Sequence, residues 1–419
     1  MRLGIILAAG KGERLRPLTS TRPKPSIPVA GMPLICRHIS MLSGYVDVIR
    51  VVASYKKNVL VDTIKNCDDF LAYRSTTGLE LIEQGAELGT GHAVRVALEA
   101  SKNLFDEVVI SYGDIFIPFK YYEEFLSGDY EVLAAETDKP WEYGVFKVKQ
   151  GLIRGVVEKP DKGSEPSNLV YGGLLKIGKN DFEEVYNIKM SPRGEYELTD
   201  AITSIGAKRG LKPLILSGSE WTDVGRPWDL LSANEYGIKE CIQESCNRLK
   251  GFNIRESETS EPAVIHVDAE VDRHSVIMGP VMISKGAYMK PFSLIRDNTF
   301  LYSYSVAGVH TEIKDSMLLE HAKVPHQSYV GDSILGEHVN LGAATQTANL
   351  RFDDKPVKMT VKGARVSTGR RKMGAVIGGY AKTGIGVLIY PGVKIGSYSW
   401  IYPGCTVSRD VEDHGKLEC

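Results

Sequence analysis

A glycine-rich segment followed by basic residues lies close to the N-terminus. It comprises Leu7, Ala8, Ala9, Gly10, Gly12 and Arg14, and a proline-rich stretch with Lys24 follows. Glycine lets backbone N–H groups approach a triphosphate, and fixed positive charge stabilises the charge that develops in nucleotidyl transfer. The segment is not a Walker motif, and it lacks the third glycine of a dinucleotide-binding GxGxxG. It predicts a nucleoside triphosphate site that uses the backbone together with Arg14 and Lys24.

Two aspartates, Asp114 and Asp223, each follow a short segment that predicts a β-strand. Carboxylates are hard ligands that suit Mg²⁺, whose remaining positions are taken by phosphate and water. Each acid alone would more readily be an exposed turn residue, but as a pair after strand ends they predict a Mg²⁺ site. This half of the chain shows no serine–histidine or cysteine–histidine pairing, and nucleotidyl transfer needs no side-chain nucleophile.

The elements that must position these residues alternate along the first half of the chain. Apolar runs at Leu3–Ala9, Val48–Ser54 and Val108–Tyr112 predict strands, and helix-length segments separate them. This alternation predicts an α/β Rossmann-like domain over residues 1–235, with a mostly parallel sheet. Ligands of such sheets bind at the carboxyl ends of the strands. A helix-like stretch, Arg226–Leu249, is followed by a polar segment, Gly251–Pro262, that is typical of a loop, and we expect a helical linker over 236–261.

The second half, residues 262–419, follows a period of six. Aliphatic residues and one threonine recur at Ile265, Val271, Ile277, Ile283, Met289 and Ile295, and again at Ile377, Thr383, Ile389, Ile395, Ile401 and Val407. A small or β-branched residue follows four positions after most of them. Such hexads predict a parallel β-helix, whereas a sandwich of short strands would give a period of two. The register breaks between about 346 and 376, where basic residues gather.

The composition excludes several classes of protein. Fifty-one basic residues balance fifty-two acidic ones, so the net charge of −1 gives no reason to expect a nucleic-acid or membrane partner. No stretch approaches the roughly 20 apolar residues of a membrane helix, and the N-terminal apolar run is too short for a signal peptide. The six cysteines include no CxxC pair. We therefore expect unpaired thiols and a reduced, cytoplasmic setting.

The motifs of the first half resemble, in order, those of the sugar-1-phosphate nucleotidylyltransferases. The resemblance implies that Leu7–Gly12 bind the nucleotide, that Asp114 and Asp223 bind Mg²⁺, and that Arg14 and Lys24 are catalytic. It further implies base recognition by Gln84, Gly89 and Thr90, and sugar-phosphate binding by Gly144, Glu158, Lys159 and the residue at position 171. The family commonly has asparagine at that position, where this chain has Tyr171. The choice of sugar therefore stays open.

The second half resembles the left-handed hexapeptide acyltransferases. His326 matches the general base of that family, and a neutral histidine accepts a proton from an amine near pH 7. Tyr329, Asn340 and Lys355 match residues that hold the sugar phosphate and amine, and Asn349 matches one near the acetyl carbonyl. Arg296 and Lys314 match phosphate-binding positions. The resemblance implies acetyl-CoA as co-substrate, with its phosphates held by the basic loop, and a homotrimer or a multiple of it.

The whole chain resembles the archaeal-type bifunctional enzymes related to the bacterial N-acetylglucosamine-1-phosphate uridylyltransferase that also acetylates glucosamine-1-phosphate. This resemblance implies Mg²⁺-dependent transfer from UTP or dTTP to glucose-1-phosphate or an N-acetylhexosamine-1-phosphate. It also implies N-acetylation of glucosamine-1-phosphate or galactosamine-1-phosphate. In the alternative, the chain is only a nucleotidylyltransferase, and the β-helix serves for oligomerisation or regulation. A non-enzymatic nucleotide-sugar sensor is disfavoured by Arg14, Lys24 and the two aspartates.

Overall fold

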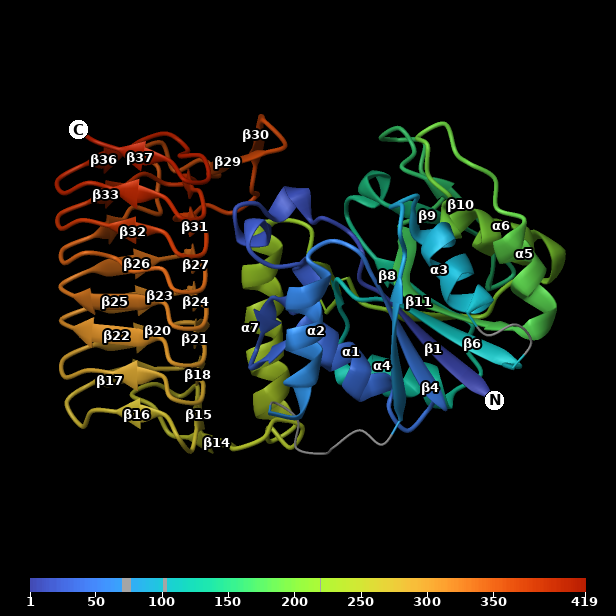
Figure 1. Cartoon of the computed structure of the whole chain (residues 1–419), viewed down its shortest axis with the longest axis horizontal. Coiled ribbons are helices and arrows are strands. Elements are labelled where there is room, and N and C mark those ends of the chain that lie inside the picture. The colour runs from blue at the N-terminus through green and yellow to red at the C-terminus, as the bar shows by residue number, and fades with distance from the viewer. Residues whose placement is uncertain (70–76, 101–103, 219) are drawn as a thin grey trace. The chain divides into compact units, whose positions relative to one another are not determined.

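The computed structural model describes residues 1–69, 77–100, 104–218 and 220–419 (Figure 1). The chain forms two compact units. The first contains Met1–Gly10, Leu34–Asn66 and most of the following chain up to Asp223. The second contains Lys11–Pro33, here called the signature loop, and Val224–Cys419. The glycine-rich segment is thus divided after Gly10, and its basic part belongs to the second unit.

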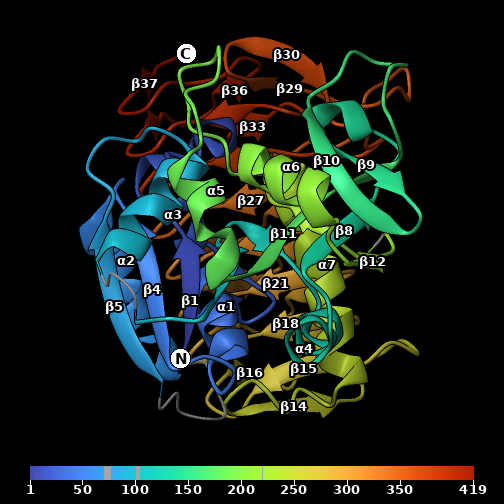
Figure 2. The same ribbon diagram turned by 90° about the vertical axis from the view of Figure 1, so that its right-hand side faces the viewer.

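A nine-stranded sheet with the order β10-β9-β11-β6-β1-β4-β5, in which β8 also pairs with β11 and β12 pairs with β8, forms the centre of the first unit. Its strands are β1 (Arg2–Leu7), β4 (Val48–Ala53), β5 (Gly78–Glu83), β6 (Glu107–Tyr112), β8 (Val132–Glu136), β9 (Gly144–Lys149), β10 (Leu152–Glu158), β11 (Leu169–Gly178) and β12 (Pro213–Leu216). Helices cover both faces: α1 (Leu34–Leu42), α2 (Lys57–Lys65) and α4 (Phe119–Ser127) lie on one side, and α3 (Thr90–Glu99), α5 (Phe182–Tyr186) and α6 (Leu198–Arg209) on the other (Figures 1 and 2).

The expectation of a mostly parallel sheet holds for only part of this sheet. Strands β6, β1, β4 and β5 are parallel to one another, and so are β8 and β12. The long strand β11 runs antiparallel to β6, β8 and β9, and β9 and β10 form an antiparallel hairpin. The sheet is therefore mixed. The alternating pattern fits only the first strands, because hairpins replace the crossover helices after β8.

The second unit is a coil of short strands that stack into long sheets. One sheet consists of β14 (Phe252–Arg255), β15 (Ala263–His266), β18 (Val281–Ile283), β21 (Thr299–Leu301), β24 (Met317–Leu318), β27 (Ile334–Leu335), β31 (Val376–Ile377) and β34 (Lys394–Ile395). A second consists of β17 (Val276–Met278), β20 (Leu294–Arg296), β23 (Glu312–Lys314), β26 (Tyr329–Gly331), β28 (Gln346–Thr347), β33 (Leu388–Ile389) and β36 (Thr406–Val407). Apart from β14 and β15, neighbouring strands of these two sheets are parallel.

The third side of the coil has two stretches of sheet. They are β16 (Glu270–Val271), β19 (Tyr288–Met289), β22 (Val306–Val309) and β25 (Lys323–His326), and then β32 (Lys382–Thr383), β35 (Trp400–Ile401) and β37 (Lys416–Leu417). Asn340 connects them, since it forms bridges to Lys323 and Lys382. A hairpin of β29 (Lys358–Val361) and β30 (Ala364–Ser367) leaves the coil where the hexad register breaks (Figure 1). These features confirm the parallel coil and the position of its inserted loop.

The hexad positions fill the interior of the coil as expected. Ile265, Ile283, Met289 and Ile295 are at most 4% exposed, and Ile377, Ile389, Ile395, Ile401 and Val407 are at most 2% exposed. Val271 and Ile277 are only partly buried, because they lie in the first turns of the coil, where fewer neighbouring turns cover them. The stacked small and aliphatic residues form one continuous core.

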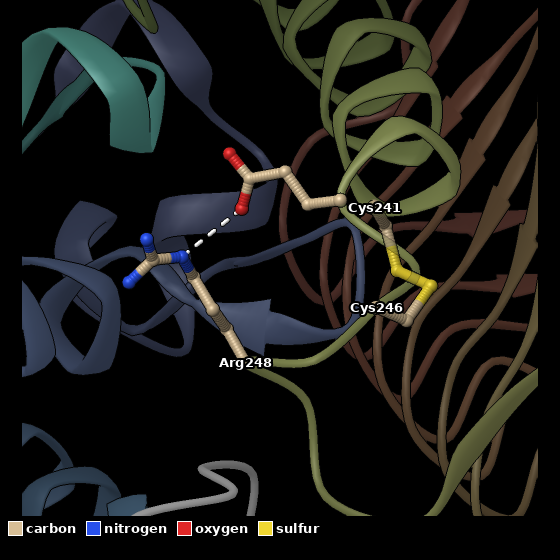
Figure 3. The surroundings of a disulfide bond; sticks show 4 residues. Cys241, Cys246 and Arg248 are labelled. Carbon is tan, nitrogen blue, oxygen red and sulfur yellow. Dashed lines mark hydrogen bonds and ion pairs between the residues drawn. A yellow bond between two sulfur atoms is a disulfide. The ribbon is translucent and has the colours of Figure 1, made fainter.

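Helix α7 (Pro227–Gln243) ends six residues before the end of the helical stretch expected from the sequence. Ser245 and Cys246 adopt positive φ angles, which stop the helix. A disulfide joins Cys241 in the last turn of α7 to Cys246 beyond it, and Arg248 pairs with Glu244 beside the bond (Figure 3).

The expectation of unpaired thiols is wrong. A second disulfide joins Cys405 to Cys419, and none of the six cysteines is free. Nothing in the cysteine spacing indicates these bonds, because disulfide pairing depends on Cα separations that the fold creates. No helix in the described part of the chain has the length and apolarity needed to cross a membrane.

Candidate functional site

The signature loop turns tightly around Gly12. It contains three short 3₁₀ turns, Glu13–Leu15, Leu18–Ser20 and Lys24–Ser26. Gly12 has a φ of 62°, and a Cβ there would lie 3.0 Å from Thr19 and 3.3 Å from Lys24. The hydroxyl of Thr19 donates to the Gly12 carbonyl at 2.9 Å. The close packing therefore requires glycine and holds Lys24 beside the turn.

The two catalytic cations predicted from the sequence both lie in this second unit. Lys24 is 4% exposed. The guanidinium of Arg14 packs against Gly225, where a Cβ would lie 2.9 Å from Nη2. Leu7, Ala8, Ala9 and Gly10, in the first unit, continue from the carboxyl end of β1, and Ala8 N–H donates to Val52 at 2.9 Å. The loop thus follows a central strand, as expected for a nucleotide site.

The structure brings the two aspartates to the same short ribbon. Strands β7 (Ile115–Phe116) and β13 (Thr222–Asp223) are antiparallel, and Asp223 pairs with Ile115, which directly follows Asp114. Both carboxylates are partly exposed. Two hard oxygen ligands on adjacent strands suit Mg²⁺, which typically takes one or two carboxylates and completes its shell with phosphate and water. Among the described residues no cluster of three or more histidines, cysteines or acids is present, so a site made by protein ligands alone is not indicated.

The predicted base-recognition residues surround the start of α3. The amide nitrogen of Gln84 donates to the Gly89 carbonyl at 3.1 Å and lies 3.2 Å from Nδ1 of His92. Gly89 has a φ of 100°, and a Cβ there would lie 2.7 Å from the Tyr196 carbonyl. The hydroxyl of Thr90 accepts the backbone N–H of Leu198 at 3.1 Å. These contacts bring Gln84, Gly89 and Thr90 together at one rigid turn.

The predicted sugar-phosphate residues meet at Glu158. Its carboxylate lies 3.8 Å from the Lys159 ammonium and accepts the hydroxyl of Thr199 at 3.5 Å. A Cβ at Gly144 would lie 2.9 Å from the same carboxylate, so the glycine leaves room for the Glu158 side chain in this position. Arg193, which the sequence analysis did not single out, lies 3.4 Å from Glu158. Lys159 is exposed, and its backbone N–H donates to Tyr143 at 2.9 Å.

Tyr171 is buried in an aromatic wall of the first unit. It is 7% exposed, and its ring packs edge-on against two other rings. The ring centroids are 5.1 Å apart for Tyr112 and 6.3 Å apart for Phe146. The adjacent Gly172 carbonyl accepts the indole N–H of Trp221 at 3.0 Å. Burial raises the pKa of Tyr171 well above its ordinary value, so the phenol stays neutral. The side chain therefore occupies space that an asparagine would leave open.

The coil carries a second cluster of polar residues. Arg296, Lys314 and Gly331 are successive partners on β20, β23 and β26. The amide of Asn349 donates to the Tyr329 hydroxyl at 3.1 Å and to Asp332 at 2.6 Å. Four of the predicted acyl-transfer residues, Arg296, Lys314, Tyr329 and Asn349, thus lie on one face of the coil.

Three further predicted residues lie outside this network of contacts. His326 is exposed at the end of β25, and Asn340 continues the same side of the coil. Lys355 is exposed on the inserted loop, where its backbone N–H donates to Asp353. In the described part of the chain its side chain does not contact Tyr329, Asn349 or Lys314.

Known proteins resemble the chain over almost its entire length. The family described as Nucleotidyl transferase matches residues 3–240. The "Bifunctional protein GlmU" of Methanocaldococcus jannaschii is 41% identical over 98% of this chain and 96% of its own. The "Bifunctional sugar-1-phosphate nucleotidylyltransferase/acetyltransferase" of Sulfurisphaera tokodaii is 38% identical over 97% of each chain. The chain belongs to this bifunctional family.

Membership of the bifunctional family confirms the prediction of an enzyme with nucleotidyltransferase and acetyltransferase halves.

Asp332, to which the sequence patterns assigned no role, lies at the centre of the acyltransferase cluster. It is 1% exposed and lies 3.9 Å from both Lys314 and Arg370. Burial raises its pKa, although Lys314 and Asn349 act in the opposite direction. Burial also opposes the charge of Lys314, but the Asp332 and Asp315 carboxylates outweigh it and raise the pKa of the lysine.

Proposed function

We propose that this enzyme transfers a nucleotidyl group from UTP or dTTP to a sugar-1-phosphate, and that it N-acetylates an amino-sugar-1-phosphate with acetyl-CoA. The proposed acceptors are glucose-1-phosphate or an N-acetylhexosamine-1-phosphate for the first reaction, and glucosamine- or galactosamine-1-phosphate for the second. The observation that supports it most strongly is that both polar clusters occur in one chain, each with its own set of predicted residues.

In the first reaction, Leu7–Gly12 would hold the triphosphate by backbone N–H groups, and Gln84, Gly89 and Thr90 would hold the base. Arg14 and Lys24 would stabilise charge on the phosphates while the sugar phosphate attacks the α-phosphate and pyrophosphate leaves. Gly144, Glu158, Lys159 and Tyr171 would hold the sugar phosphate. Asp114 and Asp223 would hold Mg²⁺, which supplies positive charge to the phosphate oxygens when bound.

In the second reaction, His326 would take a proton from the amine of the acceptor while the amine attacks the thioester carbonyl of acetyl-CoA; the carbon–sulfur bond then breaks and coenzyme A leaves as the thiol. Arg296 and Lys314 would hold the sugar phosphate, and Tyr329, Asn340 and Lys355 would orient the sugar and amine. Asn349 would lie near the acetyl carbonyl, with its amide oriented by the two hydrogen bonds that it donates to Asp332 and Tyr329. The loop with Arg351, Arg370 and Arg371 would bind the phosphates of acetyl-CoA.

The proposal includes the wider organisation of the chain. A nucleotidylyltransferase domain would cover 1–235, a linker 236–261 and a left-handed β-helix 262–419, with homotrimers or multiples of them as the assembled form. We propose a cytoplasmic location, with small molecules as the only substrates. The two disulfides depart from the usual cytoplasmic pattern, in which thiols stay reduced.

The test follows thiol release from acetyl-CoA with glucosamine-1-phosphate or galactosamine-1-phosphate, and Mg²⁺-dependent pyrophosphate release in parallel. We expect His326→Ala to abolish thiol release and leave pyrophosphate release intact. The matched control is His310→Ala, an exposed histidine one residue beyond the strand that pairs with β25. Absence of thiol release in the wild type with either amino sugar would reduce the β-helix to an assembly or regulatory domain.

A further inference from the structure

The signature loop rests on the coil of its own compact unit. Lys394 donates from Nζ to the carbonyl of Arg16 at 2.7 Å, and Ser397 donates from Oγ to the carbonyl of Pro17 at 3.1 Å. The two donors are 378 and 380 positions away from their acceptors in the sequence. The loop backbone is therefore held from the β-helix between Gly12 and Lys24.

A buried charge cluster makes a further attachment at Arg22. This residue is 8% exposed, and its Nη2 pairs with Glu320 and lies 3.3 Å from Glu337. The two carboxylates come from neighbouring turns of the coil, since His338 N–H donates to the Glu320 carbonyl at 2.9 Å. Glu337 is 4% exposed. One guanidinium from the loop thus joins two successive turns of the β-helix.

The electrostatics of this cluster favour a fixed geometry. Burial opposes the charge of Arg22, but the two carboxylates outweigh it and raise the pKa of the guanidinium. Burial raises the pKa of Glu337, while Arg22 and a hydrogen bond from Thr21 act against the rise. A buried charge that loses its partner is strongly unfavourable, so the loop cannot move away from the coil at low cost. Surface ion pairs impose no such constraint.

Glycines of the coil leave room at this contact. A Cβ at Gly378 would lie 2.6 Å from the backbone nitrogen of Ser397 in the coil and 2.9 Å from Pro17 of the loop. A Cβ at Gly379 would lie 2.5 Å from the Glu337 carboxylate. The first glycine therefore permits both the stacking of the coil and the approach of the loop, and the second leaves room for Glu337.

We propose that Arg22, together with Glu320 and Glu337, is a positioning device that fixes the signature loop on the β-helix, so that nucleotidyl transfer depends on the C-terminal coil. The inference rests on the nucleotidyl transfer proposed above. Lys24 follows Arg22 after a single proline, whose ring fixes φ, so a shift of Arg22 reaches Lys24 directly. Neither carboxylate touches the substrates in this role. They act through the loop.

The test uses isosteric variants Glu320→Gln, Glu337→Gln and the double variant, with Glu270→Gln, an exposed glutamate of the coil, as matched control. We expect kcat/KM for pyrophosphate release to fall on the order of 10- to 100-fold in the double variant, chiefly through a higher KM for the nucleotide. Thiol release by the same sample should stay within about twofold of wild type, because the acyltransferase cluster lies on another side of the coil. In the same assay Arg22→Lys, which keeps a charge, should retain more activity than Arg22→Met.

Two results would overturn the inference. The first is a double variant with unchanged kcat and KM for the nucleotide. The second is an equal fall of both activities together with a lower unfolding temperature, which would give the cluster a purely structural role in the coil. Failure of the proposed function is distinguishable, since the wild-type enzyme itself would then release no pyrophosphate.

Discussion

Tyr171 shows how one residue bears on the choice of sugar. Its hydroxyl is buried and makes no hydrogen bond to any described residue of the chain. An unsatisfied buried hydroxyl costs about 1–3 kcal/mol, so the ring, and not its polar end, justifies tyrosine here. The ring packs edge-on against Tyr112, whose hydroxyl is hydrogen-bonded to Thr90 of the predicted base-recognition turn.

We predict that volume, and not hydrogen bonding, is the property of Tyr171 that selects the sugar. Tyr171→Phe should leave the ratio of kcat/KM for glucose-1-phosphate and N-acetylglucosamine-1-phosphate unchanged, and should keep or raise the free energy of unfolding by up to about 1 kcal/mol. Tyr171→Asn should shift the ratio about tenfold towards the larger N-acetyl sugar, because it opens space. Steady-state kinetics and urea denaturation measure both effects. A shift in Tyr171→Phe as large as that in Tyr171→Asn would contradict this prediction.

The sequence predicted residues that belong to contiguous motifs, and it missed those that act across the fold. Asp114 and Asp223 were recognisable as a pair of acids in the order of the family's motifs, and the structure places Asp114 directly before β7 and Asp223 at the end of β13, which pairs with β7. Asp332 and Glu337 were not recognisable, since their partners are brought to them only by the coil. Arg22 and Glu320 are 298 positions apart, and no local pattern connects them.

At the scale of elements, the contact between the signature loop and the coil contains a lysine with an unusual titration. Burial lowers the pKa of Lys394 from 10.5 to about 8, with Arg365 acting in the same direction and Asp410 against it. In the unfolded chain this lysine keeps its proton up to its ordinary pKa. Between the two values the unfolded state binds more protons, so the contribution of Lys394 to stability rises with pH.

We therefore predict that the free energy of unfolding of wild type, relative to Lys394→Met, increases between pH 8 and pH 10.5. The increase is at most about 3 kcal/mol for a shift of this size, and below pH 8 the difference between the two proteins should be constant. Urea denaturation of both proteins at several pH values measures it, and subtraction removes the other titrating groups. A difference that falls as pH rises would show that Lys394 is not buried as described.

The last turn of the coil depends on the disulfide between Cys405 and Cys419. Strand β37 pairs with β35 on one side only, so it is an edge of the coil. The disulfide closes a separation of 14 residues, for which chain entropy predicts a stabilisation of about 3 kcal/mol. We predict that Cys419→Ser lowers the free energy of unfolding of the coil by about that amount, measured by chemical denaturation without reductant. Dithiothreitol should lower the free energy of unfolding of wild type. In the Cys419→Ser variant, which already lacks this disulfide, the decrease caused by dithiothreitol should be smaller by about the same 3 kcal/mol.

The elements differ in how far the sequence determined them. The coil was predictable because each hexad specifies one side of a turn, and Ile377 and Ile395 fill the interior as their spacing required. The mixed character of the first sheet was not predictable, since the direction of β11 is set by which strands it meets. The end of α7 depends on Ser245 and Cys246, whose positive φ angles no propensity indicates.

At the scale of the whole molecule, Lys355 is exposed on the inserted loop and, among the described residues, forms no hydrogen bond or ion pair with the polar cluster of its own chain. Tyr329, Asn349 and Lys314 belong to that cluster on the coil. The expected trimer would bring Lys355 to such a cluster if the loop of one subunit reaches the coil of its neighbour. In a closed ring each subunit then gives Lys355 to one neighbour and receives it from the other.

This arrangement predicts complementation between His326→Ala and Lys355→Ala. Each variant alone should lose thiol release, because every site lacks one residue. In mixed trimers, purified through two different tags, about one site in three should contain both residues, with His326 from one chain and Lys355 from the next. Acetyl transfer should therefore return to about a third of wild type in the mixed preparation, while pyrophosphate release is equal in all samples. Mixed trimers no more active than the single variants would place both residues in the same subunit, and a monomeric mass by light scattering would exclude the shared site altogether.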